Sequence, residues 1–367
     1  MSLLRRCTAV AASRMIVQAT APVAATPRTQ QRRWAASNAA AATAVKSPKS
    51  ATASASAFVG SASTTAAASS VPSTAASASA SPGATTTASR SQTGPWGADG
   101  PHFWLRPSEI EAYHRDGYLS LSGFLSEEEL DPIEKIYDQF MSRSISVPGR
   151  DFCDMSAVDY DTPFEEWNLV NAMLPTRYHP PLRGNIYEVR AAHVVRQLFP
   201  GENDRFALDY DQLLAKKPSR SGAVFAWHSD LAYWPTTNDM RTATFSLALD
   251  ATTRANGCLR FVPGSHLTGT IRKHKPINSD RSKAHAIACE VRPDEEVVHL
   301  EVPRGGVTIH NEFVVHGSGG NETKGWRRTY VAAFRTLETI AQERAAGFTH
   351  SHNDEVNWDT FQKWQQK

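Results

Sequence analysis

The stretch Trp227-His228-Ser229-Asp230-Leu231-Ala232-Tyr233 contains the most informative spacing in the chain. Residues two apart in an extended segment project to the same side, so His228 and Asp230 can converge on one point. Joined by a second imidazole, they would form the facial triad of two histidines and one carboxylate that is typical of non-haem iron(II) oxygenases. The His-x-Asp pattern alone is weak evidence, because it also occurs by chance in solvated loops. The surrounding sequence therefore decides its meaning.

The sequence on both sides of this stretch is typical of short β-strands. Upstream, five residues at alternate positions would share one face of a strand: Phe206, Leu208, Tyr210, Gln212 and Leu214. Downstream, short β-prone segments bounded by Gly, Pro or Asn occupy residues 242–250, 258–262, 297–302, 307–310, 313–316 and 327–335. Many short strands of this kind indicate a sandwich or a barrel.

Helices are expected before most of these strands. Two capping boxes, Ser108 with Glu111 and Ser126 with Glu129, predict helix starts, and Gly117 suits the left-handed end of the first helix. The other elements expected here are an apolar helical stripe (Leu130, Ile133, Tyr137 and Phe140), a strand at 118–124 and a helix at about 187–199. A helical cluster followed by antiparallel strands predicts an α+β protein with a jelly-roll core.

A histidine and two arginines farther downstream complete the chemistry. His316 precedes Gly-Ser-Gly-Gly-Asn, and Arg327 and Arg328 begin the last predicted strand, so the histidine and the arginines would share a hairpin. The planar fork of an arginine matches a carboxylate, and it could hold the distal carboxylate of 2-oxoglutarate while the 2-oxo acid end chelates iron. Strand alternation lets only one of the two arginines face inward.

Several motifs in one order resemble the phytanoyl-CoA dioxygenase family of 2-oxoglutarate oxygenases. The likeness extends from about Ser108 to Arg335. Its motifs are Tyr-His-Arg-Asp-Gly-Tyr at 113–118, Gly-Phe-Leu at 123–125, His-Ser-Asp-Leu-Ala-Tyr at 228–233, Asn-Gly-Cys-Leu at 256–259, Val-Pro-Gly-Ser-His at 262–266, and the block from His316 to Arg327.

The resemblance implies a double-stranded β-helix (jelly-roll, cupin-like) core with flanking N-terminal helices. It also implies iron(II) bound by His228, Asp230 and His316, with 2-oxoglutarate and dioxygen as co-substrates. The expected reaction hydroxylates a small organic or acyl substrate and releases succinate and carbon dioxide. Halogenating relatives lack the carboxylate, so Asp230 favours hydroxylation.

The resemblance further implies that Arg327 and Ser318 contact 2-oxoglutarate, and that Leu213 and Ser246 line its pocket. The family's phytanoyl-CoA enzyme has an indole where this chain has Ser246, which leaves the shape of the pocket and the substrate open. A lysine that contacts the co-substrate upstream of the barrel in the family has no counterpart that the sequence identifies. His266 and His310 are interpreted as hydrogen-bonded residues rather than rival ligands.

Two other functions are compatible with the sequence. One is a jelly-roll metalloenzyme that does not use 2-oxoglutarate, and the other is a non-catalytic scaffold of the same fold. Arg327 argues against the first, because that enzyme needs no buried guanidinium there. The combination of His228, Asp230, His316 and Arg327 argues against the second. The substrate stays open between an acyl-CoA, a small metabolite and a natural-product intermediate.

The composition divides the chain into three parts. All 37 acidic residues lie from Asp99 onward, whereas residues 1–44 are rich in Arg, Ser and Ala, which predicts a mitochondrial transit peptide with processing near Arg32-Arg33. The alternative is a cytoplasmic protein with a disordered tail. Residues 45–98 are expected to be an Ala/Ser/Thr-rich disordered linker, and residues 99–367 the dioxygenase domain.

The composition also limits the partners. The sequence contains no apolar run long enough to span a membrane, and no Lys/Arg run with interleaved aromatics that would indicate nucleic-acid binding. The four cysteines have no metal-clip or redox spacing. A small-molecule substrate is therefore expected, and the oligomeric state stays open.

Overall fold

The computed structural model describes residues 96–156, 159–201, 205–239, 241–280, 283 and 285–356. The predicted transit peptide at 1–44 and almost all of the predicted linker lie outside these residues. The first described strand, β1 (Gly97–Asp99), pairs with β2 (His102–Trp104).

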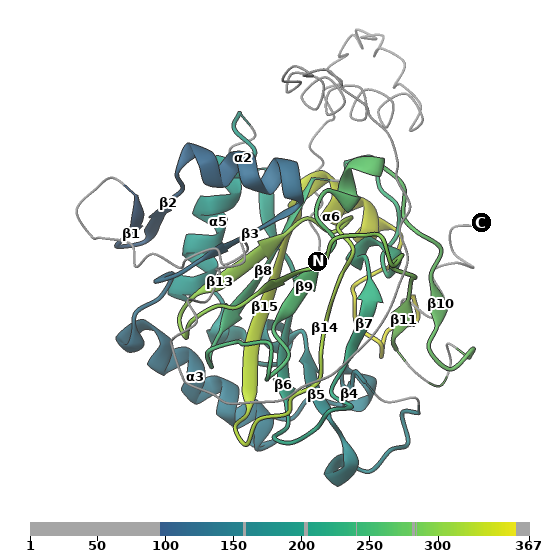
Figure 1. Ribbon diagram of the computed structural model, residues 1–367. Coiled ribbons are helices and arrows are strands. Elements are labelled where there is room, and N and C mark those ends of the chain that lie inside the picture. The colour runs from purple at the N-terminus through teal and green to yellow at the C-terminus, as the bar shows by residue number, and fades with distance from the viewer. Residues whose placement is uncertain are drawn as a thin grey trace, which may run out of the picture.

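Two antiparallel sheets form the centre of the described chain (Figure 1). The larger sheet has seven strands in the order β3 (Tyr118–Leu121), β13 (Val307–His310), β8 (Thr242–Ala248), β15 (Arg327–Thr336), β6 (Phe206–Lys216), β5 (Leu169–Met173) and β4 (Phe152–Asp154). The smaller sheet has four strands in the order β12 (Val298–Leu300), β9 (Leu259–Phe261), β14 (His316–Ser318) and β7 (Phe225–His228). Side chains from both sheets line one pocket, so the sheets face each other across it.

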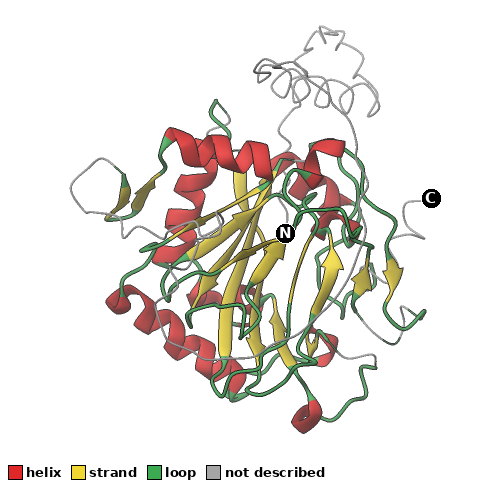
Figure 2. Ribbon diagram, viewed as in Figure 1, coloured by secondary structure: helices red, strands yellow, loops and turns green. Residues whose placement is uncertain are grey.

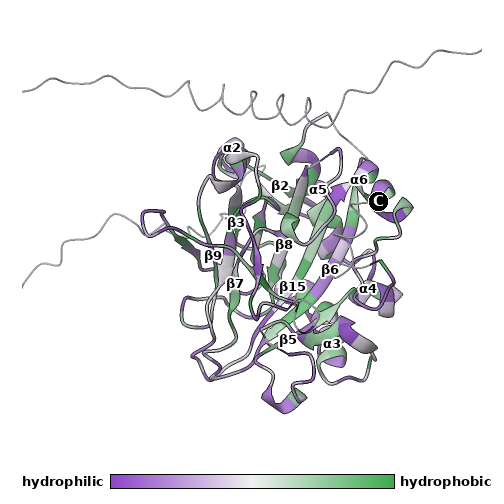
Figure 3. Cartoon of the chain, turned by 90° about the vertical axis from the view of Figure 1, so that its right-hand side faces the viewer, coloured by the Kyte–Doolittle hydropathy of each residue, from purple (hydrophilic) through white to green (hydrophobic). Residues whose placement is uncertain are grey.

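Helices cover the outer face of the larger sheet (Figure 2). These helices are α2 (Pro107–Asp116), α3 (Glu127–Met141) and α5 (Ile186–Leu198). The other α-helices and strands are α4 (Pro175–Tyr178), α6 (Leu337–Ala345), β10 (Lys275–Pro276) and β11 (Ile287–Ala288). Apolar residues of α3, α5, β6 and β15 form one buried cluster, and Figure 3 shows such residues in green on α3 and on the strands. None of the helices in the described ranges is long and apolar enough to cross a bilayer.

Burial on both faces explains why β6 and β15 contain few exposed positions. One face of each strand packs against the helices, and the other lines the pocket. The two strands pair from Arg327 opposite Lys216 to Thr336 opposite Phe206, with one register shift at Ala333/Phe334. Alternation along these strands therefore separates the hydrophobic core from the pocket.

The helix starts confirm one sequence prediction and correct another. Ser126 and Glu129 form the expected capping box of α3, with reciprocal hydrogen bonds of 3.3 and 2.9 Å. The box predicted at Ser108 and Glu111 is wrong, because α2 begins earlier, at Pro107. Proline suits the first helical position, since its fixed φ is already helical and it lacks an N–H group. The predicted end of α2 at Gly117 is confirmed by its φ of 86°.

One predicted strand is displaced, and several elements were not expected from the sequence. Residues 313–316 were predicted as a strand, but β14 begins only at His316, because the preceding residues form a turn in which Val314 N–H donates to Asn311 O at 3.1 Å. The strands β5 and β7 and the helix α6 were also missed. All five residues of β5 are buried, so its sequence shows no apolar–polar alternation.

Candidate active site

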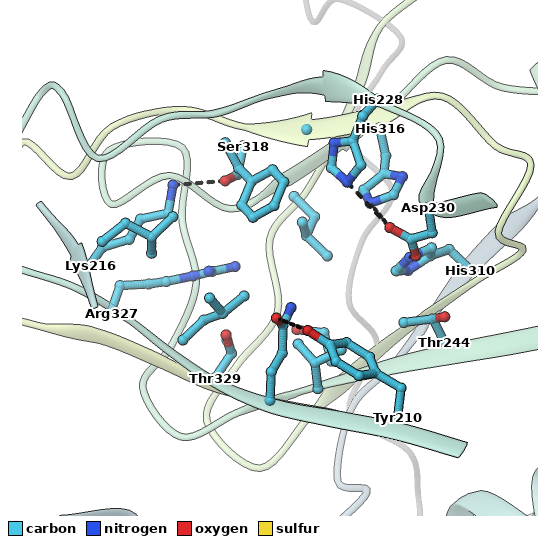
Figure 4. A pocket seen from close by; sticks show the side chains of 18 of the residues that line it. Tyr210, Lys216, His228, Asp230, Thr244, His310, His316, Ser318, Arg327 and Thr329 are labelled. Atoms are coloured by element: carbon cyan, nitrogen blue, oxygen red, sulfur yellow. Dashed lines mark hydrogen bonds and ion pairs between the residues drawn. The ribbon is translucent and has the colours of Figure 1, made fainter. Parts of the chain in front are cut away.

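Two neighbouring strands bring the predicted metal ligands together. His228 ends β7, His316 begins β14, and the two residues are directly paired across these strands. Asp230 lies two residues after His228, at the start of a short 3-10 helix, Asp230–Ala232. The Oδ1 atom of Asp230 is 3.2 Å from His228 Nε2 and 3.5 Å from His316 Nε2 (Figure 4). The three ligand atoms lie within 4.8 Å of one another, which is compatible with a single bound metal ion.

The backbone fixes the tautomer of both histidines. His228 Nδ1 donates to the carbonyl oxygen of Ala226 at 2.8 Å, and His316 Nδ1 donates to that of Val314 at 3.1 Å. A carbonyl oxygen only accepts, so in the neutral imidazoles the lone pair is on Nε2. Both lone pairs then face the carboxylate of Asp230, as expected for metal ligands that are oriented by outer hydrogen bonds.

The protonation states of the triad also suit a cation. Burial raises the pKa of Asp230, but His316, His228 and His310 outweigh it and hold that pKa well below its usual range. Burial, with His228 nearby, lowers the pKa of His316 well below its ordinary value. An ionised carboxylate beside a neutral imidazole is the combination that binds a divalent metal.

A pocket of about 620 Å³ extends from the triad to Arg327. Arg327 is 3% exposed, and burial lowers its pKa to about 10. Its neighbour Arg328 lies on the opposite face of β15 and forms ion pairs with Glu134 and Asp250 at 2.6 and 2.9 Å. The prediction that only one of these arginines faces inward is therefore confirmed.

The three other residues predicted to contact the co-substrate differ in position. Ser318 and Ser246 both line the pocket. Leu213 does not, and this prediction needs correction: its side chain belongs to the hydrophobic core under the helices. Because β6 alternates between core and pocket, the adjacent Leu214 lines the pocket instead.

Lys216 is a pocket residue that the sequence analysis missed. It ends β6 directly opposite Arg327 and is only 1% exposed. Its ammonium group hydrogen-bonds Ala223 O at 2.6 Å, Ser318 Oγ at 2.7 Å and the carbonyl oxygen of Gly319. The signal that identifies it is alternation, since position 216 continues the pocket-facing series of positions 210, 212 and 214.

The other histidines have the hydrogen-bonded roles that were expected. His310 Nε2 lies 3.0 Å from Asp230 Oδ2, the oxygen that does not pair with His228 or His316, and its ring centroid is 4.4 Å from that of His316. His266 Nε2 hydrogen-bonds the carbonyl oxygen of His114 at 3.1 Å, and His266 does not line the pocket.

A second chamber, of about 410 Å³, adjoins the triad. It is continuous with the first pocket, and its walls combine aromatic, methionine and imidazole side chains. The residues common to both are Tyr210, Gln212, Phe225, His228, Asp230 and Trp234. Tyr233 lines it, whereas Trp227 packs near Val262 and under the guanidinium of Arg260. The residues of this chamber outside the triad are Met155, Met173, Tyr210, Gln212, Phe225, Tyr233, Trp234, His285, Phe348, His350 and His352.

Another group of metal-ligating residue types adjoins this chamber through His350. Asp209, Glu343 and His350 are buried and close together. Arg335 pairs with both carboxylates and with Glu312, and Arg344 pairs with Asp209 and Glu343. The guanidinium groups already neutralise these carboxylates, so the group is an ion-pair network rather than a metal site.

Comparison with known proteins agrees with this geometry. Residues 113–329, more than half of the chain, match the family described as phytanoyl-CoA dioxygenase (PhyH). The chain belongs to the phytanoyl-CoA dioxygenase family. It is therefore an iron(II)- and 2-oxoglutarate-dependent dioxygenase.

Relatives within this family differ in the substrates that their names give. A "Probable alpha-ketoglutarate-dependent hypophosphite dioxygenase" of Stutzerimonas stutzeri is 33% identical over 236 residues, which cover 62% of this chain and 77% of that protein. An "Ectoine dioxygenase" of Streptomyces anulatus is 23% identical over 261 residues, covering 68% of this chain and 84% of that protein. A "Probable phytanoyl-CoA dioxygenase" of Caenorhabditis elegans is 31% identical over 153 residues, covering 36% and 47%.

A solved structure with a similar fold is EvdO2 from Micromonospora carbonacea var. aurantiaca. It is 25% identical with a TM-score of 0.51, and the match covers 63% of this chain and 91% of that one.

Proposed function

We propose that His228, Asp230 and His316 hold the iron of this dioxygenase, and that Arg327 and Ser318 bind the distal carboxylate of 2-oxoglutarate. The observation that carries the proposal is a single pocket with the triad at one end and a buried guanidinium at the other. Within the described part of the chain, Arg327 has no carboxylate partner and its Nε has no hydrogen-bond acceptor. An unpaired buried charge is costly, and an anionic co-substrate would compensate it.

The residues present fit both groups. The triad offers two imidazole Nε2 atoms and one carboxylate on a shared face, which is the donor set of non-haem iron oxygenases. When bound there, iron with 2-oxoglutarate and dioxygen supplies oxidation of a C–H bond, coupled to the conversion of 2-oxoglutarate to succinate and carbon dioxide. The protein holds the ligands, orients the co-substrate and excludes water. His310 holds the outer oxygen of Asp230, which leaves Oδ1 toward the metal position.

The second chamber is the proposed site of the primary substrate, because it adjoins His228 and Asp230 and is separate from Arg327. Its mixture of aromatic rings and imidazoles suits a small organic molecule with both apolar and polar surface. The names of the relatives range from hypophosphite to phytanoyl-CoA, so they support oxidation of a small substrate.

The fold assignment supports the same proposal. We propose that the two facing antiparallel sheets are the double-stranded β-helix of this enzyme class. Support comes from the shared pocket between the sheets and from the similarity to EvdO2. A jelly-roll metalloenzyme that does not use 2-oxoglutarate would have no need for the buried pair of cations at the end of the pocket.

Two measurements test the proposed roles. Purified protein with iron(II) and 2-oxoglutarate is screened against candidate substrates, and succinate release that depends on one of them is expected. In parallel, iron(II) is titrated anaerobically into wild type and into His228→Ala, Asp230→Ala and His316→Ala, with His266→Gln as a buried control. Each ligand variant should bind iron far more weakly than the control does. Wild-type affinity in any of the three would remove that residue from the ligand set.

A further inference from the structure

Two cations face each other at the far end of the co-substrate pocket. Lys216 on β6 and Arg327 on β15 are directly opposite in the register, and both are almost fully buried. Like charges at such positions destabilise a sheet. Burial, with Arg327 and Arg260 nearby, lowers the pKa of Lys216 well below its ordinary value. Within the described ranges neither residue forms an ion pair, and Arg327 Nε has no acceptor, so an anion in the pocket would compensate a positive charge that the protein leaves unpaired.

A count of donors shows that Lys216 has none to spare for that anion. A lysine ammonium has three N–H donors. Three protein acceptors surround Nζ: the carbonyl oxygens of Ala223 and Gly319, and Ser318 Oγ. Lys216 is thus saturated by the protein, unlike Arg327, whose Nε has no acceptor among the described residues.

The same count leaves the hydroxyl hydrogen of Ser318 available. Ser318 Oγ accepts from Lys216 at 2.7 Å and has no other hydrogen-bond partner in the part of the chain that the structure describes. Ser318 lines the pocket beside Arg327 (Figure 4). A hydroxyl that accepts a hydrogen bond from an ammonium group has to direct its own hydrogen elsewhere. In the proposed function, the acceptor in this pocket is the distal carboxylate of 2-oxoglutarate.

We propose that Lys216 is a positioning residue that acts through Ser318: it holds the Ser318 oxygen so that the hydroxyl donates to the distal carboxylate of 2-oxoglutarate beside Arg327. This inference rests on the proposed function, because it assumes that 2-oxoglutarate occupies this pocket. Lys216 also ties the end of β14 to β6 through Gly319. Because the Ser318 hydroxyl donates to the distal carboxylate, its positioning by Lys216 makes the pocket selective for 2-oxo acids that bear a second carboxylate.

A double-mutant cycle tests the inference. The variants are Lys216→Met, Ser318→Ala and the double variant, with Lys217→Met as a matched control. Lys217 is adjacent in sequence, but its Nζ donates outside the pocket, to Phe164 O at 2.5 Å. Affinity for 2-oxoglutarate is measured calorimetrically on the anaerobic iron(II) protein, and KM and kcat are measured by succinate release. The same calorimetry uses 2-oxovalerate, which has a methyl group in place of the distal carboxylate.

If Lys216 acts through Ser318, Lys216→Met weakens 2-oxoglutarate binding at least tenfold and changes kcat less than threefold. Its effect should shrink to less than threefold in the Ser318→Ala background. Binding of 2-oxovalerate should change less than threefold in every variant, and Lys217→Met should behave like wild type. Fully additive effects of the two substitutions, or equal losses for both 2-oxo acids, would overturn the inference.

Two further results distinguish failure of this inference from misfolding of Lys216→Met and from failure of the proposed function. If Lys216→Met does not fold, the inference is tested by Ser318→Ala alone. An affinity of Ser318→Ala for 2-oxoglutarate within twofold of the wild-type affinity would then overturn the inference. If wild type binds iron(II) but its affinities for 2-oxoglutarate and 2-oxovalerate are equal, the proposed function of the pocket fails instead.

Discussion

His310 Nε2 lies 3.0 Å from Asp230 Oδ2, whereas Asp230 Oδ1 faces His228 and His316. The carboxylate is thus held from its outer side by a residue that comes from a different sheet. His310 belongs to β13 of the seven-stranded sheet, and His316 belongs to β14 of the four-stranded one. The contact therefore links the position of a proposed ligand to the packing of the two sheets.

Substitution of His310 should weaken iron binding without removing a ligand. In His310→Leu, Asp230 loses its outer hydrogen bond, and losses of this kind cost about 10–100-fold in metal affinity. Anaerobic iron(II) titration measures the effect, and His266→Gln is the control because His266 is equally buried but remote from the pocket. Unchanged iron affinity in His310→Leu would show that Asp230 is held by other contacts.

The two adjacent arginines of β15 should give opposite phenotypes. Arg327→Ala should raise the KM for 2-oxoglutarate at least tenfold, because hydrogen bonds to charged groups contribute about 1.5–3 kcal/mol and about 1.4 kcal/mol is one factor of ten. Arg327→Lys should recover only part of this, since an ammonium group cannot match the carboxylate fork. Steady-state kinetics of succinate release measure both effects.

Arg328→Ala should leave that KM within about threefold of wild type and reduce stability instead. Its guanidinium group pairs with Asp250 and Glu134 and is largely buried by them, so its loss should lower the free energy of unfolding by about 1.5–3 kcal/mol. Urea unfolding measures the difference. A larger KM defect in Arg328→Ala than in Arg327→Ala would contradict the orientation of both side chains.

The buried network that adjoins the second chamber predicts a pH-dependent contribution to stability. His350 Nε2 lies 2.9 Å from Asp209 and 3.3 Å from Glu343. Burial lowers the pKa of His350, but these two carboxylates outweigh it, and the pKa is raised overall. A histidine with a raised folded-state pKa stabilises the protein fully below its unfolded pKa of about 6.5, and that contribution is lost as the pH rises through the folded pKa.

His350→Gln should therefore lose the most stability in acid and progressively less above about pH 6.5. His266→Gln should show the opposite trend, because burial lowers the pKa of His266 and wild type loses stability there as the pH falls. Urea unfolding of both variants and wild type across the pH range measures the two slopes. A flat difference for His350→Gln would mean that His350 has the same pKa in the folded and the unfolded protein, and would contradict this prediction.

We propose that residues 1–44 direct the protein to mitochondria and are removed near Arg32-Arg33. The motivation is the Arg-containing, acid-free start of the chain, because such segments form basic presequences. N-terminal sequencing of the native protein should find a first residue within or just after 32–37. An intact Met1 or Ser2 would argue for the cytoplasmic alternative.

Much of the site could be predicted from the sequence because its key spacings are local. His228 and Asp230 are two residues apart, and Arg327 and Arg328 are adjacent, so strand alternation alone defines which atoms can converge. His316 was singled out by its place before the predicted arginine strand, and Ser318 came from the family resemblance; the structure brings both to the pocket.

The errors arose where local patterns do not determine tertiary position. Leu213 was taken from the family resemblance, but its side chain lies in the hydrophobic core and its neighbour Leu214 lines the pocket. Lys216 was missed because a lysine at the end of a strand usually indicates a solvated position, and only the pairing with β15 buries it. The second chamber depends on residues 348–352, which lie beyond the region of family resemblance and pack back onto the triad.

The single register shift between β6 and β15 lies at Ala333/Phe334, at the opposite end of the ladder from Arg327. Loss or gain of one residue of β15 between the register shift and Arg327 would exchange the two faces of the strand. Arg328 would then face the co-substrate, and Arg327 would face the helices. Length differences between homologous genes should therefore fall in the loops outside these two strands. Within the strands, between the bulge and the arginine, one-residue insertions and deletions should be absent even where the amino acids themselves have diverged.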